Sequence, residues 1–149
     1  MTQAYTHRFT EVQEVQDFLV PAVKTAAAYS TAYVNLANHQ RVFYLLATGT
    51  MVATSTINLQ IWQATSAAGA GAKVVVGKAI TALTAAGGDG DDLCGIEVRT
   101  EELDVDGKFS FVAGILTVAN AASAVTLIPL YGCSNYPPVP VTNWTEVID

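Results

Sequence analysis

Charged residues are scarce in this chain. Asp, Glu, Lys and Arg together make up 13% of its 149 residues, about half of the usual share. Only seven residues are basic, no two of them are adjacent, and the formal net charge is −6. Phosphate binding needs clustered Lys and Arg, so this composition argues against a nucleic-acid partner. Because residues 25–72 carry one formal charge, on Arg41, we expect an oligomer that hides a low-charge surface. The alternative is an alanine-rich monomer with a neutral polar surface.

Long apolar runs are missing as well. The longest, Val42 to Ala53, has about twelve residues and is interrupted by Thr48, Gly49 and Thr50, which is too short to cross a bilayer. The first residues, MTQAYTHRFTEVQEVQDF, are mostly polar, whereas an export signal needs an apolar run there. These features predict a protein that is made in a cytoplasm and has no membrane partner.

Residues that typically carry chemistry are few. Cys94 and Cys133 lie far apart in the sequence, and neither has a Cys or His neighbour at metal-ligand spacing. This predicts two reduced thiols, and a disulfide between them is the alternative. The two histidines, His7 and His39, are also separated, and we expect His39 to lie in a turn. The Gly-x-Ser-x-Gly motif of many hydrolases is absent from the sequence. We therefore expect no enzymatic activity, no metal centre and no cofactor.

The sequence does contain an acidic stretch, Thr84 to Asp106, which holds eight of the thirteen acidic residues. Three of these carboxylates follow two glycines closely, a pattern typical of a solvated turn, although a calcium site is the alternative. An EF-hand does not fit, because Cys94 stands where that loop requires glycine. The later acids are expected to form a polar strand surface with Glu97 facing outward, in preference to acid/base catalysis. The residues concerned are Asp89, Asp91, Asp92, Glu97, Glu101, Glu102 and Asp104.

Most of the chain shows the patterns of β-structure. Apolar and polar residues alternate from Met51 to Trp62, which predicts a strand with one apolar face. Residues 41–47 and 125–131 are rich in bulky β-forming side chains. Gly49 predicts a turn, and Asp106-Gly107 predicts a hairpin. About eight short strands separated by such turns indicate an all-β sandwich or barrel.

The two ends of the chain differ from its middle. Residues 1–17 are predicted to form an arm, in which Thr10 to Asp17 is either a short helix or extended chain leading into a strand from Asp17 to Val23. Pro21 restricts that strand to a sheet edge. Residues 18–135 form the β domain, and residues 136–149 form an extended, proline-rich tail. The residues expected to contact a capsid or a second subunit are Phe9, Val12, Val15, Phe18, Tyr136, Pro137, Pro138 and Trp144.

Three segments of the sequence resemble one known family. They are YVNLANHQRVFYLLATG (33–49), residues 59–105 with their QAT, GAGAK and EELDV elements around a Gly/Asp turn, and TNWTEVID (142–149). These segments are similar to the small decoration proteins, also called cement or head-stabilisation proteins, of tailed bacteriophages. The resemblance implies a jelly-roll-like sandwich, usually trimeric, which binds the major capsid protein on the outside of the virion. It implies no catalytic residues.

The expected function is therefore structural. A homotrimer on the capsid exterior would bridge capsomers through sheet surfaces and extended ends. One alternative is another virion component, such as a neck, tail or head-fibre protein, with the same β-architecture. A different class of alternative is a carbohydrate-binding module that stacks sugars on Trp62 or Trp144, although packing is the more common role of such residues.

Overall fold

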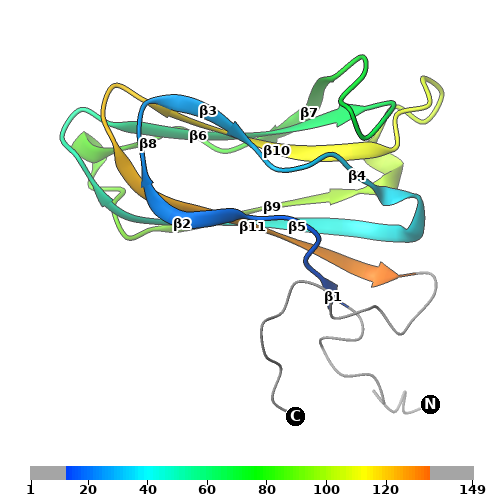
Figure 1. Ribbon diagram of the computed structural model, residues 1–149, viewed down its shortest axis with the longest axis horizontal. Coiled ribbons are helices and arrows are strands. Elements are labelled where there is room, and N and C mark those ends of the chain that lie inside the picture. Colours follow the sequence, from blue (N-terminus) through cyan, green and yellow to red (C-terminus); the bar gives the residue numbers. More distant parts are fainter. Residues whose placement is uncertain (1–12, 135–149) are drawn as a thin grey trace, which may run out of the picture.

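The computed structural model describes residues 13–134, which form two antiparallel sheets packed face to face (Figure 1). The prediction of an all-β sandwich is confirmed. Sheet A contains β1 (Gln13–Glu14), β2 (Leu19–Lys24), β5 (His39–Met51), β9 (Leu93–Arg99) and β11 (Ser123–Ser134). Sheet B contains β3 (Ala27–Ser30), β4 (Val34–Asn35), β6 (Thr56–Ala64), β7 (Lys73–Ala79), β8 (Leu83–Thr84) and β10 (Phe111–Ala119). Three short 3-10 helices join them: η1 (Leu36–Asn38), η2 (Ala85–Gly87) and η3 (Thr100–Glu102).

The order of the strands is that of a jelly roll. In sheet A, β1 and β2 pair with β11, which is followed by β5 and β9. In sheet B, β3 and β4 pair with β10, which is followed by β6 and then by β7 and β8. Apart from the consecutive pair β6 and β7, strands that neighbour each other in a sheet come from distant parts of the chain, and many of the connections cross between the sheets. Two interlocked Greek keys of this kind define the double-sheet jelly roll.

The core lies between the two sheets. On β5, the side chains of Val42, Tyr44 and Leu46 are fully buried, and on β6 those of Ile57, Leu59 and Ile61 are too. The alternation predicted for β6 is thus confirmed, although the strand begins at Thr56 and not at Met51. Burying such side chains stabilises the fold by about 1.5–3 kcal/mol each before entropy is counted.

Three local predictions were wrong. Gly49 lies inside β5, and the chain reverses at residues 52–55, where Thr54 has a φ of 72°. His39 is the first residue of β5 and is 5% exposed, so it is not a turn residue. Asp106-Gly107 does not close a hairpin, because β9 lies in sheet A while β10 lies in sheet B. In each case, pairing between distant strands set the local conformation.

The predicted arm is partly integrated into sheet A. A helix over residues 10–17 is wrong, since Gln13 and Glu14 form β1 and pair with Gly132 and Tyr131 of β11. The extended alternative is the correct one for the described residues. As expected from Pro21, β2 is an edge strand, and its pairing with β11 is irregular between Val125 and Leu127.

The sheet edges are protected against pairing with other chains. At the β9 edge, the Lys78 ammonium of β7 donates a hydrogen bond of 2.7 Å to the Glu97 carbonyl. Gly77, with a φ of 77°, lies within β7, whose pairing with β6 is irregular, and Pro21 lies within β2. Irregular strands, lysines and prolines are the usual means of preventing edge-to-edge association. Contacts with other molecules are therefore expected at the faces of the sandwich. No helix among the described residues is long and apolar enough to span a membrane.

Candidate interaction surfaces

The outer face of sheet A is apolar, although it points away from the core. Phe43 and Leu45 alternate with the buried residues of β5 and are only half-buried. Their partners in register on β11 are Leu130 and Ile128. An antiparallel sheet usually presents polar side chains on the face opposite its core. Here both faces are apolar, and the outward set comprises Phe43, Leu45, Ala47, Leu93, Ala124, Ile128 and Leu130.

A groove of about 400 Å³ crosses one end of this face. Its floor consists of small residues of β5 and β11, and β2 forms one side. Val23 on β2 is 70% exposed, and Leu93, which pairs with Ala47, is 69% exposed. All of its lining residues belong to β2, β5 and β11. We call it the sheet A groove, and its lining residues are Pro21, Ala22, Val23, Ala47, Thr48, Gly49, Ala124, Val125 and Thr126.

The acidic turn, Gly88 to Asp92, is held against the end of the groove. The Thr48 amide donates to the Asp92 carbonyl at 2.9 Å, and the Asp91 amide donates to the Gly49 carbonyl at 3.3 Å. The Asp89 carboxylate accepts a 2.7 Å hydrogen bond from the Thr84 amide. Asp91 and Asp92 are exposed, as predicted for a solvated turn. Among residues 13–134, no group of side chains has the arrangement of a metal site.

The opposite end of the same face carries charges that neutralise one another. Arg41 and Arg99 pair in register across β5 and β9, and the Glu97 carboxylate lies 3.7 Å from Arg41 and 3.5 Å from Arg99. Glu101 lies 3.5 Å from Arg99. Glu97 points outward as expected. Glu102 is bound by Lys78 at 2.8 Å, which together with the Arg99 amide lowers the pKa of its carboxyl group. These acids form ion pairs at a polar surface, in line with the expected polar strand.

The outer face of sheet B has no charged side chain among its described outward residues. Trp62 on β6 pairs in register with Ala113 on β10, which is fully buried although it points away from the core. The indole nitrogen of Trp62 is buried as well, so this ring has a packing role. Val76 on β7 is 92% exposed. The outward residues include Ala28, Ser30, Asn58, Gln60, Trp62, Val74, Val76, Ile115 and Thr117.

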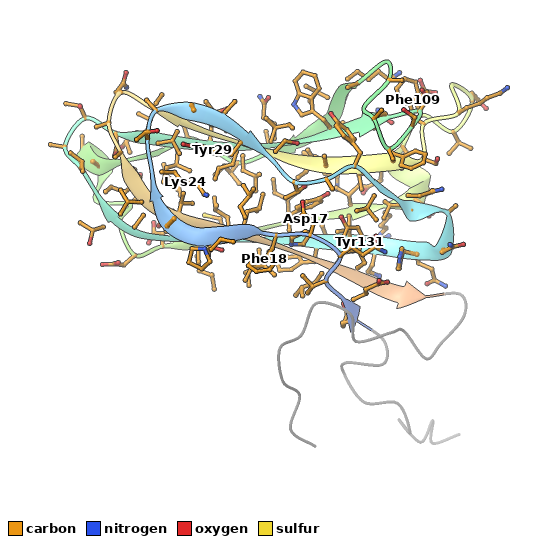
Figure 2. The ribbon with its side chains drawn as sticks, viewed as in Figure 1. Asp17, Phe18, Lys24, Tyr29, Phe109 and Tyr131 are labelled. Atoms are coloured by element: carbon orange, nitrogen blue, oxygen red, sulfur yellow. The ribbon has the colours of Figure 1, made fainter. Side chains whose placement is uncertain are left out.

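The residues expected to anchor the arm have different positions. Val15 is 6% exposed and is one of the buried hydrophobic residues, so burial inside the protein accounts for its apolar side chain. Phe18 is 39% exposed and lies on the side of sheet A that faces away from sheet B (Figure 2). Its role as an anchor stays a prediction. The other candidates, Phe9, Val12, Tyr136, Pro137, Pro138 and Trp144, lie outside the described residues.

His39 connects β1 to the body of sheet A. Its Nε2 atom lies 3.7 Å from the Glu14 carboxylate and 3.5 Å from the Gln16 amide nitrogen. Burial lowers the pKa of His39, and the neighbouring Glu14 only partly offsets this effect. Nearby, the Asp17 carboxylate accepts a 2.6 Å hydrogen bond from the Ala32 amide. The entry of the chain into sheet A is thus fixed by polar contacts on both sides of Val15.

Sequence reasoning missed the sheet A groove. The run Val42 to Ala47 has no alternation of apolar and polar residues, and such a run is typical of a strand covered on both faces. That pattern indicated a second apolar face. The groove itself combines residues from β2, β5 and β11, and only the pairing of distant strands brings them together.

Comparisons with known proteins reveal only remote similarity. No protein-family model and no curated protein sequence matches this chain. Among solved structures, one of infectious bursal disease virus, Gt strain, is 12% identical, with a TM-score of 0.45, over 85% of this chain and 33% of that chain. A structure of the Gx strain is 13% identical, with a TM-score of 0.42, over 86% and 31%. The chain thus spans about a third of the length of these proteins, and scores this low support no conclusion about function.

Proposed function

We propose that this protein is a structural virion component that binds the outer surface of a bacteriophage capsid as a homotrimer and stabilises it by bridging capsomers. The observation that carries the proposal is the character of the two outer sheet faces. The outer face of sheet A is apolar except for mutually neutralised charges at one end, the outer face of sheet B is uncharged, and the two faces lie on opposite sides of the same sandwich (Figure 1). Together with the resemblance of residues 33–49, 59–105 and 142–149 to phage decoration proteins, this favours function by contact.

A bridging protein needs at least two separate contact surfaces, one for its own copies and one for the shell. The two faces meet this requirement, because a thin jelly roll leaves both of them accessible to other molecules. The protected edges, with Lys78 at β9 and Pro21 in β2, favour contacts through faces over the addition of strands. Many copies on one shell would add their contacts, so each individual contact needs only modest affinity.

The proposal can be tested with two measurements on the purified protein. Size-exclusion chromatography with light scattering should give three times the chain mass of 15.7 kDa. The protein should also sediment with empty shells assembled from the major capsid protein of the same genome. Ile115→Lys, which charges the outer face of sheet B, should reduce the trimer, whereas Val105→Lys, at a position 65% exposed outside the strands, should not. A strictly monomeric protein that stays in the supernatant would overturn the proposal.

A further inference from the structure

We propose that the sheet A groove binds an extended segment of another protein, in which small apolar side chains are followed by a Lys or Arg that meets the acidic turn. This inference deepens the proposed function, because it assigns the shell contact to one face and gives the chemistry of the shell segment. It relies on that function only for the source of the segment.

The shape of the groove suits an extended chain. Its floor consists of Ala47, Gly49, Ala124 and Thr126, whose small side chains let another backbone approach closely. Val23 and Leu93 stand beside the floor, more than two thirds exposed. The volume of about 400 Å³ lies within the range of roughly 300–1,000 Å³ that is usual for binding sites. Small or branched apolar side chains would fill this space.

The charge at the end of the groove selects a basic partner. Asp91 borders the floor, since its carboxylate lies 3.9 Å from where a β-carbon on Gly49 would be. Asp91 and Asp92 are exposed, and no Lys or Arg of the described residues forms an ion pair with them. By contrast, Glu97, Glu101, Glu102 and Asp104 are all paired with cations. Asp91 and Asp92 therefore place two carboxylates without a described cation partner beside the apolar groove.

Lys24, the basic residue of β2, does not act as the basic partner of Asp91 and Asp92. Lys24 at the end of β2 lies 4.9 Å from the centre of the Tyr29 ring, turned toward sheet B and away from the groove (Figure 2). Arg8 lies outside the described residues.

The tail does not fit either. Its only charged residues are the acids Glu146 and Asp149, which the acidic turn would repel. We therefore assign the segment that combines small apolar and basic residues to another molecule. With a formal net charge of −6, the protein as a whole also attracts basic segments. A segment of a capsid protein that displays Lys or Arg beside small apolar residues has the complementary chemistry.

A selection from a random decapeptide display library tests this inference. Wild-type protein should enrich peptides with small apolar residues followed by Lys or Arg. Val23→Glu, in the groove, should reduce their affinity at least about tenfold, whereas Val105→Glu should leave it unchanged; the two valines are 70% and 65% exposed, so both variants should fold. Asp91→Asn combined with Asp92→Asn should also weaken binding, and Asn tolerates the positive φ of 60° at position 91.

Several results would overturn the inference. These are the absence of any enriched peptide, enriched peptides without a basic preference, and equal binding by the Val23→Glu and Val105→Glu variants. Self-association that the Val23→Glu variant loses would assign the groove to a second copy and would equally refute a foreign segment. Specific peptide binding without shell binding would refute the virion role and leave the groove assignment intact. Shell binding that is insensitive to Val23→Glu would refute the groove assignment alone.

Discussion

Two adjacent leucines of β5 should lose very different amounts of stability when each is replaced by alanine. Leu46 points into the core and is fully buried, whereas Leu45 points to the outer face of sheet A and is half-buried. Leu46→Ala should lower the free energy of unfolding by about 2–5 kcal/mol, because it removes buried groups and leaves a cavity. Leu45→Ala should lower it by about 1 kcal/mol or less, since part of that side chain already meets water.

These energies translate into measurable melting temperatures. For a chain of this size, a change of 1 kcal/mol shifts the midpoint of thermal unfolding by about 2–4 °C. Leu46→Ala should therefore lower the midpoint by roughly 4–20 °C, and Leu45→Ala by at most about 2–4 °C. Differential scanning calorimetry measures both values on the same preparation of each variant.

In a binding measurement, we expect Leu45→Ala to have the larger effect of the two variants. If the outer face of sheet A contacts a partner, Leu45→Ala should weaken sedimentation with capsid shells, while folded Leu46→Ala protein should bind as the wild type does. Equal losses of stability in the two variants would refute the assigned orientation of β5. Unchanged shell binding by Leu45→Ala would refute the role of this face.

Three further predictions concern particular residues. Burial lowers the pKa of His39 in the folded protein, so the unfolded chain takes up this proton first as the pH falls, and the free energy of unfolding should decrease from about pH 7 to pH 5. Urea midpoints should show this loss in the wild type and less of it in His39→Gln. An identical pH dependence of the two proteins would contradict the assignment. Burial and the nearby Asp92 and Asp89 raise the pKa of the Cys94 thiol. Its alkylation at pH 8, followed by mass spectrometry of the Cys94 peptide, should therefore be slower than that of free cysteine, and it should be faster in Asp92→Asn than in the wild type. A rate equal to that of free cysteine would refute this prediction. Gly95→Val should destabilise the protein by about 1–3 kcal/mol, because a β-carbon there would overlap the Phe43 ring; an unchanged urea midpoint would show that the ring moves freely.

The architecture could be predicted from the sequence where each strand has one buried face. β6 shows this best, since Ile57, Leu59 and Ile61 alternate with polar residues and are all buried. Pro21 placed β2 at an edge for a similarly local reason, because proline cannot donate a hydrogen bond to a neighbouring strand. Local rules succeeded where the physical cause is itself local.

The remaining features depend on contacts between distant residues. Gly49 is typical of a turn, yet the pairing of β5 with β11 continues as far as Met51 and Ser123. Asp106-Gly107 has the composition of a hairpin, but its flanking strands belong to different sheets. The sheet A groove combines residues 21–23, 47–49 and 124–126, and no spacing within the sequence brings these three segments together.

Electron cryomicroscopy of capsid shells incubated with the protein tests the central claim most directly, namely that this protein acts through its sheet faces as a binding component. We predict additional density on the outside of the shell, at positions of three-fold symmetry, with the outer face of sheet A toward the capsid protein. Shells without additional density, or density that contacts the capsid only through the loops at the ends of the sandwich, would contradict the account.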